Sequence, residues 1–234
     1  YWVDLENPYI TYETEYIETL WYLLKQMHQK GYLYKGHTIQ PYSPAAGTGL
    51  SSHELNQPGT YKPVKDTTAV AQFKLTQASA EQASKLFGLA PGSEISALAW
   101  TTTPWTLPSN TALAVGKNIS YVCIHTFNAY SHKPVTVILA EQLVGKHFNP
   151  AAAELAPDAY KAGDKLIPYA VSGSVKGSEL AGLEYEQLLN FDDNRRELIE
   201  GDAFRVIIGD FVTTEDGTGI VHIAPSFGAD DFRV

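Results

Sequence analysis

From Ile95 to Asn110 the chain reads ISALAWTTTPWTLPSN, a regular segment followed by a polar one. Apolar and small residues alternate over 95–99, which is typical of a strand with one buried face. The strand then meets a run of hydroxyl side chains that is stiffened by proline and flanked by tryptophan. Hydroxyls held on a restricted backbone can bind a small polar ligand and a water molecule. Since Thr also favours strands, the alternative is an edge strand that leaves its sheet at Pro104.

A second polar segment, GTGIVHIAPSFGADD, lies near the end of the chain at residues 217–231. A glycine-rich turn leads into a short strand that carries His222, and another turn then presents Asp230 and Asp231. His222 and Asp231 are nine residues apart with a turn between them, so both can face one pocket. Histidine can shuttle a proton near neutral pH, and a carboxylate can hold a cationic amine.

Two other interpretations of the second segment remain open. His222 can be a hydrogen-bonded core histidine, with Asp230 capping a helix that begins near Phe232. A metal site built from His222, Asp230 and Asp231 is disfavoured, because no second His or Cys lies at ligand spacing. We therefore expect no metal ligands in this chain.

The composition describes an ordinary globular protein of 234 residues with a net charge of −9. Such an acidic chain is not expected to bind nucleic acid by charge alone. Its single cysteine, Cys123, excludes a disulfide within the chain and fits a reducing cytoplasm. No apolar stretch approaches the ~20 residues that cross a membrane, and no signal peptide is visible. We expect a cytoplasmic protein with no membrane partner.

Residues 12–30 carry the strongest helical pattern, with apolar residues at helical spacing from Ile17 to Met27. Thr11 is the predicted N-cap, and Gly31 the predicted stop. Residues 32–66 are rich in proline and glycine, which predicts an irregular connector. The sequence thus divides into a helical lead-in with a connector, residues 1–66, and a second part, residues 67–234.

The second part alternates short apolar runs with turn residues, which predicts an α+β protein that is mostly β, a barrel or sandwich with short peripheral helices. Short helices are expected at 80–87, ended by Gly88, and at 185–190. Residues 192–200 form a charged, solvated run. Strands are expected at 68–75, 95–102, 111–115, 120–127, 135–140, 166–171, 203–208 and 220–224.

Several catalytic and nucleotide-binding motifs are missing from the sequence. There is no glycine-rich loop followed by Lys and Ser or Thr, and no dinucleotide fingerprint, so the chain is not expected to activate ATP. There is also no Gly-x-Ser-x-Gly elbow, which disfavours a serine nucleophile.

Taken together, the two polar segments resemble the editing domain of the isoleucyl-tRNA synthetases, a large insertion in class I synthetases. Residues 1–9 and 41–54 also look like this family, so four separate motifs occur in the family's order. Where this chain has Thr103 and Trp105, valyl and leucyl relatives carry an arginine and an acidic residue. Ser43 and Ala46 stand where many relatives have zinc-binding cysteines, so we expect no zinc.

The resemblance implies a function in translational fidelity. One methylene group gives only ~1–3 kcal/mol of discrimination, a magnitude known from the isoleucyl-tRNA synthetases themselves. Valine is therefore attached to tRNA(Ile) in error. The implied activity is hydrolysis of valyl-tRNA(Ile) by a β-barrel editing domain at 67–234, with 1–66 joining it to the parent catalytic domain. The implied partners are the acceptor end of tRNA(Ile) carrying valine and the rest of the synthetase, of which this chain, a monomer when isolated, is a fragment.

The resemblance also implies substrate-binding residues. Asp231 should pair with the α-ammonium group of the substrate. Thr101, Thr102 and Trp105 should line a small side-chain pocket. His222 should close that pocket, so that valine fits and the extra methylene of isoleucine clashes.

The implied catalytic residues are Thr103, Thr106, Asn110 and His222. The first three should position the terminal adenosine or the attacking water. Since none of them is a strong general base, catalysis should come from positioning water against an already reactive ester. No cofactor is expected in this chain, because ATP and Mg²⁺ serve the synthetic site of the parent enzyme.

Two rival functions remain open. One is a non-catalytic β-barrel module that docks the aminoacylated acceptor end of tRNA. The other is a free-standing deacylase, against which the lead-in of residues 1–40 and the abrupt ends of the chain argue.

Overall fold

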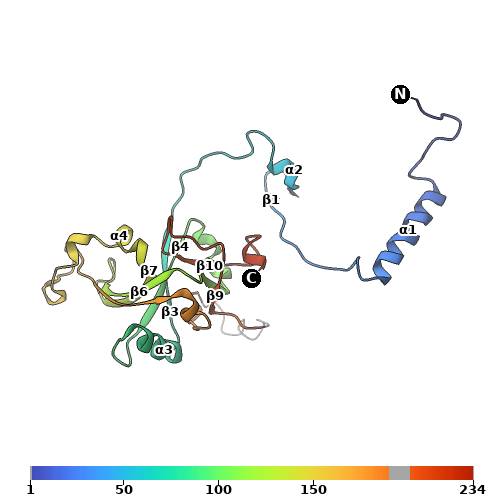
Figure 1. The fold of residues 1–234 in the computed structure, drawn as a ribbon. Helices are drawn as coiled ribbons and strands as arrows, with labels where there is room; N and C mark the ends of the chain where they lie inside the picture. The colour runs from blue at the N-terminus through green and yellow to red at the C-terminus, as the bar shows by residue number, and fades with distance from the viewer. Residues whose placement is uncertain (1, 190–200, 234) are drawn as a thin grey trace. The chain divides into compact units, whose positions relative to one another are not determined.

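The computed structural model describes residues 2–189 and 201–233 and divides the chain into two compact units, Tyr1–Thr38 and Ile39–Val234. The first unit contains α1 (Thr14–Gln29), which confirms the helix predicted over 12–30 (Figure 1). The predicted cap at Thr11 is wrong. The N-cap is Glu13, whose backbone is extended and whose side chain makes no capping bond, so the helix begins later than the hydroxyl suggested.

The second unit begins with a largely irregular segment, as the proline and glycine content predicted. It holds only short elements: β1 (Tyr42–Ser43), β2 (Thr48–Gly49) and α2 (Ser52–Leu55). The helix α2 is stabilised by a capping box, in which Ser51 and Glu54 bond to each other's backbone N–H groups. Residues 61–68 then run without helix or strand to the first long strand.

A five-stranded sheet forms the larger part of the second unit, in the order β3-β4-β7-β6-β8. Its neighbouring strands are antiparallel, except that β4 and β7 run parallel. The strands are β3 (Ala69–Lys74), β4 (Ile95–Thr101), β6 (Ser120–Phe127), β7 (Pro134–Ala140) and β8 (Ala170–Lys176).

A three-stranded sheet, in the order β10-β5-β9, completes the β structure. Here β5 (Ala112–Val115) lies between β10 (Ile220–Ile223), to which it is antiparallel, and β9 (Arg205–Ile208), to which it is parallel. The α+β class predicted from sequence is confirmed. Among the described residues the hydrogen bonds form these separate sheets, and no closed barrel is found.

The core lies between the two sheets and under α3 (Gln77–Phe87), which Thr76 caps and Gly88 ends in the left-handed conformation. Phe73, Leu113 and Tyr121 are fully buried there. The opposite face of the large sheet is covered in part by α4 (Val144–His147) and the segment after it. Figure 1 shows α3 and α4 on different sides of this sheet.

The remaining elements are short. They are η1 (Pro104–Ser109), η2 (Glu141–Leu143), η3 (Pro150–Ala152), η4 (Pro157–Ala159), α5 (Gly177–Leu180) and η6 (Asp231–Arg233). Within the described ranges no helix is both long and apolar enough to cross a membrane.

Two sequence predictions of secondary structure are wrong. The strand expected at 166–171 begins only at Ala170, after Pro168, which has no N–H group for a sheet ladder. The helix expected at 185–190 is absent over 185–189, because Tyr185 forms a β-bridge with Leu75 and buries its ring in the core. Residue 190 and the charged run at 192–200 lie outside the described residues.

The buried phenol of Tyr185 donates a hydrogen bond of 2.6 Å to Asn110 Oδ1. Replacing Tyr185 with Phe should leave that oxygen without its donor and lower the free energy of unfolding by ~1–3 kcal/mol, as measured by denaturant unfolding. Tyr61 is 76% exposed, so Tyr61→Phe is the matched control and should change stability very little. Equal stability of Tyr185→Phe and the wild type would contradict this role.

Candidate functional site

The two polar segments meet at a cavity of about 390 Å³, called here the Thr–His cavity. One wall comes from the end of β4 and the start of η1, and the other from β10 and the turn that follows it. The lining residues are Trp100, Thr101, Thr102, Thr103, Trp105, Thr106, Val221, His222, Phe227 and Asp231. The structure therefore brings seven of the eight predicted site residues together.

Asn110 is the exception, because it does not line the Thr–His cavity. Its side chain is only 5% exposed and donates to the carbonyl oxygen of Ala112 at 2.8 Å. Its Oδ1 accepts the hydrogen bond from Tyr185. These bonds fix the chain between η1 and β5, behind the cavity.

Hydroxyl groups form a chain of close contacts along one wall. Thr101 Oγ1 lies 3.3 Å from Thr103 Oγ1, which lies 3.4 Å from Thr106 Oγ1. The backbone N–H of Thr103 also donates to Thr101 Oγ1 at 3.0 Å. This local bonding turns the backbone away from the sheet at Pro104 and keeps the hydroxyls on the cavity side.

His222 is held by the last of these hydroxyls, with 2.9 Å between its Nε2 and Thr106 Oγ1. The Thr106 hydroxyl has a single proton, which it donates to the carbonyl oxygen of Thr103 at 2.9 Å. It must then accept a proton from Nε2–H, so this network assigns the Nε2–H tautomer to a neutral ring. His222 Nδ1 is buried and has no hydrogen-bond partner among the described residues.

Burial lowers the pKa of His222 below its usual 6.5, and the nearby negative charge of Asp231 opposes this shift only in part. The side chain is 7% exposed, so a charged ring would lose most of its hydration. At neutral pH His222 is therefore uncharged. Its ring forms a fixed part of the cavity wall, and its Nδ1 is an unpaired acceptor.

Asp231 begins η6 and is half-buried at the edge of the Thr–His cavity. Its Oδ2 accepts a hydrogen bond of 3.1 Å from the backbone N–H of Ala224. Arg233 pairs with Asp230, and none of the ion pairs in the described part of the chain involves Asp231. A carboxylate oriented in this way, without a cation of its own, can receive an ammonium group.

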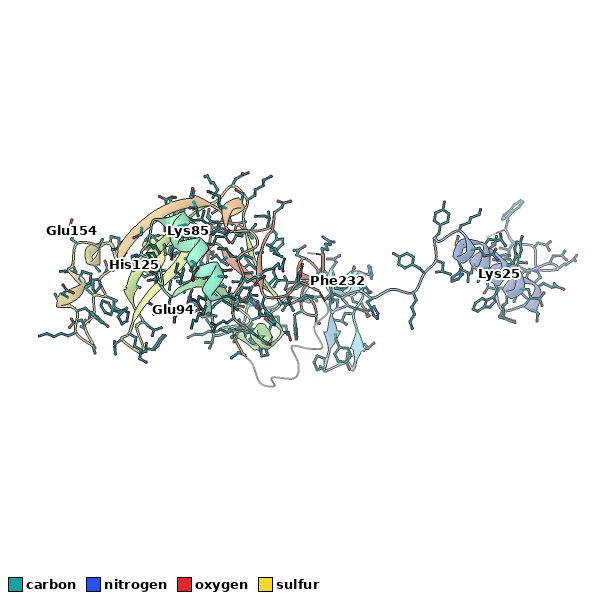
Figure 2. The ribbon with its side chains drawn as sticks, turned by 90° about the horizontal axis from the view of Figure 1, so that it is seen from below. Lys25, Lys85, Glu94, His125, Glu154 and Phe232 are labelled. Carbon is teal, nitrogen blue, oxygen red and sulfur yellow. The ribbon has the colours of Figure 1, made fainter. Side chains whose placement is uncertain are left out.

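Gly228 allows this placement of Asp231. A Cβ atom at position 228 would lie 3.0 Å from Asp231 Cγ, closer than ordinary packing permits. In Figure 2, Phe232, the residue after Asp231, lies at the opposite end of the second unit from His125 and Glu154.

Other lining residues were not predicted from the sequence. Trp100, Val221 and Phe227 line the cavity and were missed. Trp105, which was predicted, is 58% exposed there. For Trp100 a signal existed, since it directly precedes the predicted threonine residues 101–103 in the sequence. For Val221 and Phe227 the sequence alone offered none.

Thr218 joins the two walls. Its hydroxyl is buried, accepts from the Trp100 N–H at 3.3 Å and donates to the Ile220 carbonyl at 3.2 Å. Its own carbonyl accepts from Ala140 N–H at 2.9 Å. Gly217 packs against Trp100, since a Cβ atom at position 217 would lie 2.9 Å from Trp100 Cε3.

The cavity thus combines hydroxyls, a neutral imidazole and a carboxylate. Cys123 lies on β6 away from the cavity, and its burial raises the pKa of its thiol to about 12, so it is no nucleophile for this site. Among the described residues no group of three or more His, Cys, Asp or Glu side chains is arranged to hold a metal ion. The arrangement suits binding of a cationic amine and orientation of a water molecule.

Comparison with known proteins gives the family. Residues 1–188 match the tRNA synthetases of class I (I, L, M and V), and the chain belongs to this family. Within it, the whole chain is 64% identical to the isoleucine--tRNA ligase of Cytophaga hutchinsonii. Over 99% of this chain, the sequence is 45% identical to the isoleucine--tRNA ligase of Clostridium tetani. The chain spans 20% and 18% of these relatives, respectively.

Among solved structures, the chain was matched to the P. knowlesi cytosolic leucyl-tRNA synthetase editing domain, with 16% identity and a TM-score of 0.48 over 70% of this chain and 60% of that one.

The lowered pKa of His222 predicts a dependence of stability on pH. The unfolded chain takes up a proton at this histidine near pH 6.5 and the folded chain only at lower pH, so the unfolded state binds more protons between these values. The free energy of unfolding should therefore decrease as pH falls from 6.5 through the folded pKa. His222→Gln should lose this component in denaturant titrations at a series of pH values. An identical pH profile for the two proteins would contradict the buried neutral ring.

Proposed function

We propose that the chain is the editing domain of an isoleucine--tRNA ligase and hydrolyses the ester bond of valyl-tRNA(Ile). One observation carries the proposal: segments more than 100 residues apart in sequence place seven predicted residues around a single cavity. Membership of the class I synthetases and similarity to isoleucine--tRNA ligases over the whole chain support it.

In the proposed reaction Asp231 binds the α-ammonium group of the aminoacyl ester. The ammonium is the one positive charge that every aminoacyl ester carries, and Asp231 is the one carboxylate among the described residues that line the Thr–His cavity. A charge-assisted hydrogen bond there fixes the substrate by its common end. The side chain of the amino acid then points towards the opposite wall.

That wall selects by size. Thr101, Thr102 and Trp105 surround the side chain, and His222 closes the pocket in a position fixed by its bond to Thr106. An extra methylene group must displace a buried, hydrogen-bonded ring, whereas valine does not reach it. Since a steric clash costs more than a lost contact, this pocket excludes isoleucine more strongly than the synthetic site excludes valine.

Water attacks the ester carbonyl, and the hydroxyls of Thr103 and Thr106 position the water or the terminal adenosine. Asn110 acts from behind the cavity, by holding the chain that carries them. None of the described residues that line the cavity is a strong general base, so the rate comes from orientation and from hydrogen bonds to the developing oxyanion. The proton of water leaves to solvent or to the tRNA leaving group.

The proposed partners are the acceptor end of tRNA(Ile) and the remainder of the synthetase. We propose that hydrolysis needs no metal or nucleotide bound to this chain, and that ATP and Mg²⁺ act at the synthetic site. With its net charge of −9 the chain alone should hold tRNA weakly. The rival function, a non-catalytic docking module, would bind valyl-tRNA and release it unhydrolysed.

Replacing Asp231 with Asn should raise the KM for valyl-tRNA(Ile) deacylation by about 10- to 150-fold, the value of a hydrogen bond to a charged group. The amide keeps the acceptor for Ala224 N–H, so the fold is preserved. The matched control is Asp230→Asn, which removes a charge one position earlier and outside the cavity. Equal loss in the two variants, or no loss in Asp231→Asn, would contradict the ammonium site.

Replacing His222 with Ala should open the pocket, so that isoleucyl-tRNA(Ile) becomes a substrate. The measurement is the ratio of deacylation rates for isoleucyl- and valyl-tRNA(Ile), which should rise at least tenfold, in line with ~1–3 kcal/mol per methylene group. His125→Ala, outside the Thr–His cavity, is the control and should keep the wild-type ratio. Continued rejection of isoleucine by His222→Ala would exclude this histidine as the size filter.

A further inference from the structure

The two walls of the Thr–His cavity come from strands of different sheets. β4 belongs to the larger sheet and β10 to the smaller one, so no ladder of strand hydrogen bonds fixes the distance between them. Thr218 lies two residues before β10, is 1% exposed and is not among the residues that line the cavity. Its contacts nevertheless connect the two walls directly.

Thr218 occupies the place where β4 and β7 separate. The parallel pairing of these strands ends at Ala97, whereas β4 continues beyond it. The N–H of Trp100 lies past this pairing and donates to Thr218 Oγ1 at 3.3 Å. The N–H of Ala140, the last residue of β7, donates to the Thr218 carbonyl oxygen at 2.9 Å. One residue therefore bridges the ends of two diverging strands.

The same hydroxyl also reaches β10. Thr218 Oγ1 donates its one proton to the carbonyl oxygen of Ile220 at 3.2 Å, while it accepts from the β4 side. Trp100 is one residue before Thr101 on the first wall, and Ile220 is two residues before His222 on the second. Since two residues of a strand span about 6.6 Å, a displacement at this hydroxyl moves both walls.

The turn Gly217–Gly219 is itself held at each of its three carbonyl oxygens. His147 Nε2 lies 2.7 Å from the first, Ala140 N–H donates to the second, and the phenol of Tyr121 donates to the third at 2.6 Å. Tyr121 is fully buried, and burial raises the pKa of its phenol to about 12, so the donor is kept at neutral pH. Thr218 therefore holds the walls from a fixed position.

A size filter tolerates little movement of its walls. Valine and isoleucine differ by one methylene group, and a C–C bond is about 1.5 Å long. A wall that moves by about 1 Å makes room for much of that group. Displacements of this size change rates by about 100-fold even when they originate away from the reacting atoms.

We propose that Thr218 is a positioning residue of the size filter: its hydroxyl sets the width of the Thr–His cavity and thereby the limit between valine and isoleucine. The inference rests on the proposed function, because the filter acts on the amino acid of an aminoacyl ester. Thr218 does not touch the substrate and acts through Trp100 and Ile220. Without its hydroxyl, the N–H and carbonyl groups of these residues bond to water, and the walls separate.

The test measures deacylation of isoleucyl- and valyl-tRNA(Ile) by the full-length protein. Thr218→Val keeps the branched shape of the side chain and removes both hydrogen bonds of the hydroxyl. The ratio of kcat/KM for the isoleucyl ester to that for the valyl ester should rise about 10-fold, within the 10- to 200-fold that one methylene group supplies. Thr218→Ser keeps the hydroxyl and should retain the wild-type ratio.

The matched control is Thr126→Val, the same substitution at another buried threonine. Thr126 Oγ1 donates to the carbonyl oxygen of Pro168 at 2.9 Å, away from the Thr–His cavity. This variant should lower the midpoint of denaturant unfolding, as Thr218→Val does, and keep the wild-type ratio. An unchanged or lower ratio in Thr218→Val, or an equal rise in Thr126→Val, would overturn the proposal.

If Thr218→Val does not fold, Thr218→Cys takes its place, with Thr126→Cys as its control. A thiol is a weaker donor and acceptor than a hydroxyl, so the ratio should still rise in Thr218→Cys and stay constant in the control. An unchanged ratio in Thr218→Cys would overturn the proposal as well.

Failure of the proposed function would be seen separately, as a wild-type protein that hydrolyses neither ester. The position of the wall is then followed through His222, whose pKa is lowered by burial. In Thr218→Val water reaches the ring, so an NMR titration of the full-length protein with labelled histidine should give a His222 pKa closer to 6.5. Asp231, which raises this pKa, is present in every variant. A His222 pKa that is the same in Thr218→Val and the wild type would overturn the inference.

Discussion

The site depends on the junction that Thr218 makes between the two sheets. Its buried hydroxyl and carbonyl join the end of β4, the start of β10 and β7 by three hydrogen bonds. Leaving these buried groups unpaired would cost ~1–3 kcal/mol each. The threonine run follows β4 and His222 lies on β10, so this junction sets the distance between the two walls of the cavity.

With that distance fixed, the hydrogen bond between Thr106 and His222 determines the shape of the cavity. The ring is neutral because burial lowers its pKa, and it cannot turn without giving up its bond to Thr106. In the proposed function both properties matter. A charged ring would compete with the substrate ammonium for Asp231, and a mobile ring would make room for a larger side chain.

The sequence predicted the strands and helices whose own residues carry a clear hydrophobic pattern. Strands such as 95–102 and 120–127 alternate strongly, and the structure confirms them within a residue. The helix expected at 185–190 failed because Tyr185 is fixed by contacts with distant residues. The expectation that Asn110 lines the cavity failed for the same reason. Its side chain is held by Tyr185, which lies 75 positions away in sequence, and no local pattern reveals that contact. Whether the strands form two separate sheets or one closed barrel depends on which strands pair, and this pairing is likewise set by contacts between residues distant in sequence.

The pairing of β4 places the cavity beside the core. Ala97 and Ala99 point into the core between the sheets, where small side chains let the sheets approach closely. Thr101 continues this face into the Thr–His cavity, and Trp100 lines the cavity from the opposite face. A shift of β4 by one residue would exchange the two faces, so the pairing that buries the core also places the hydroxyl of Thr101 at the cavity.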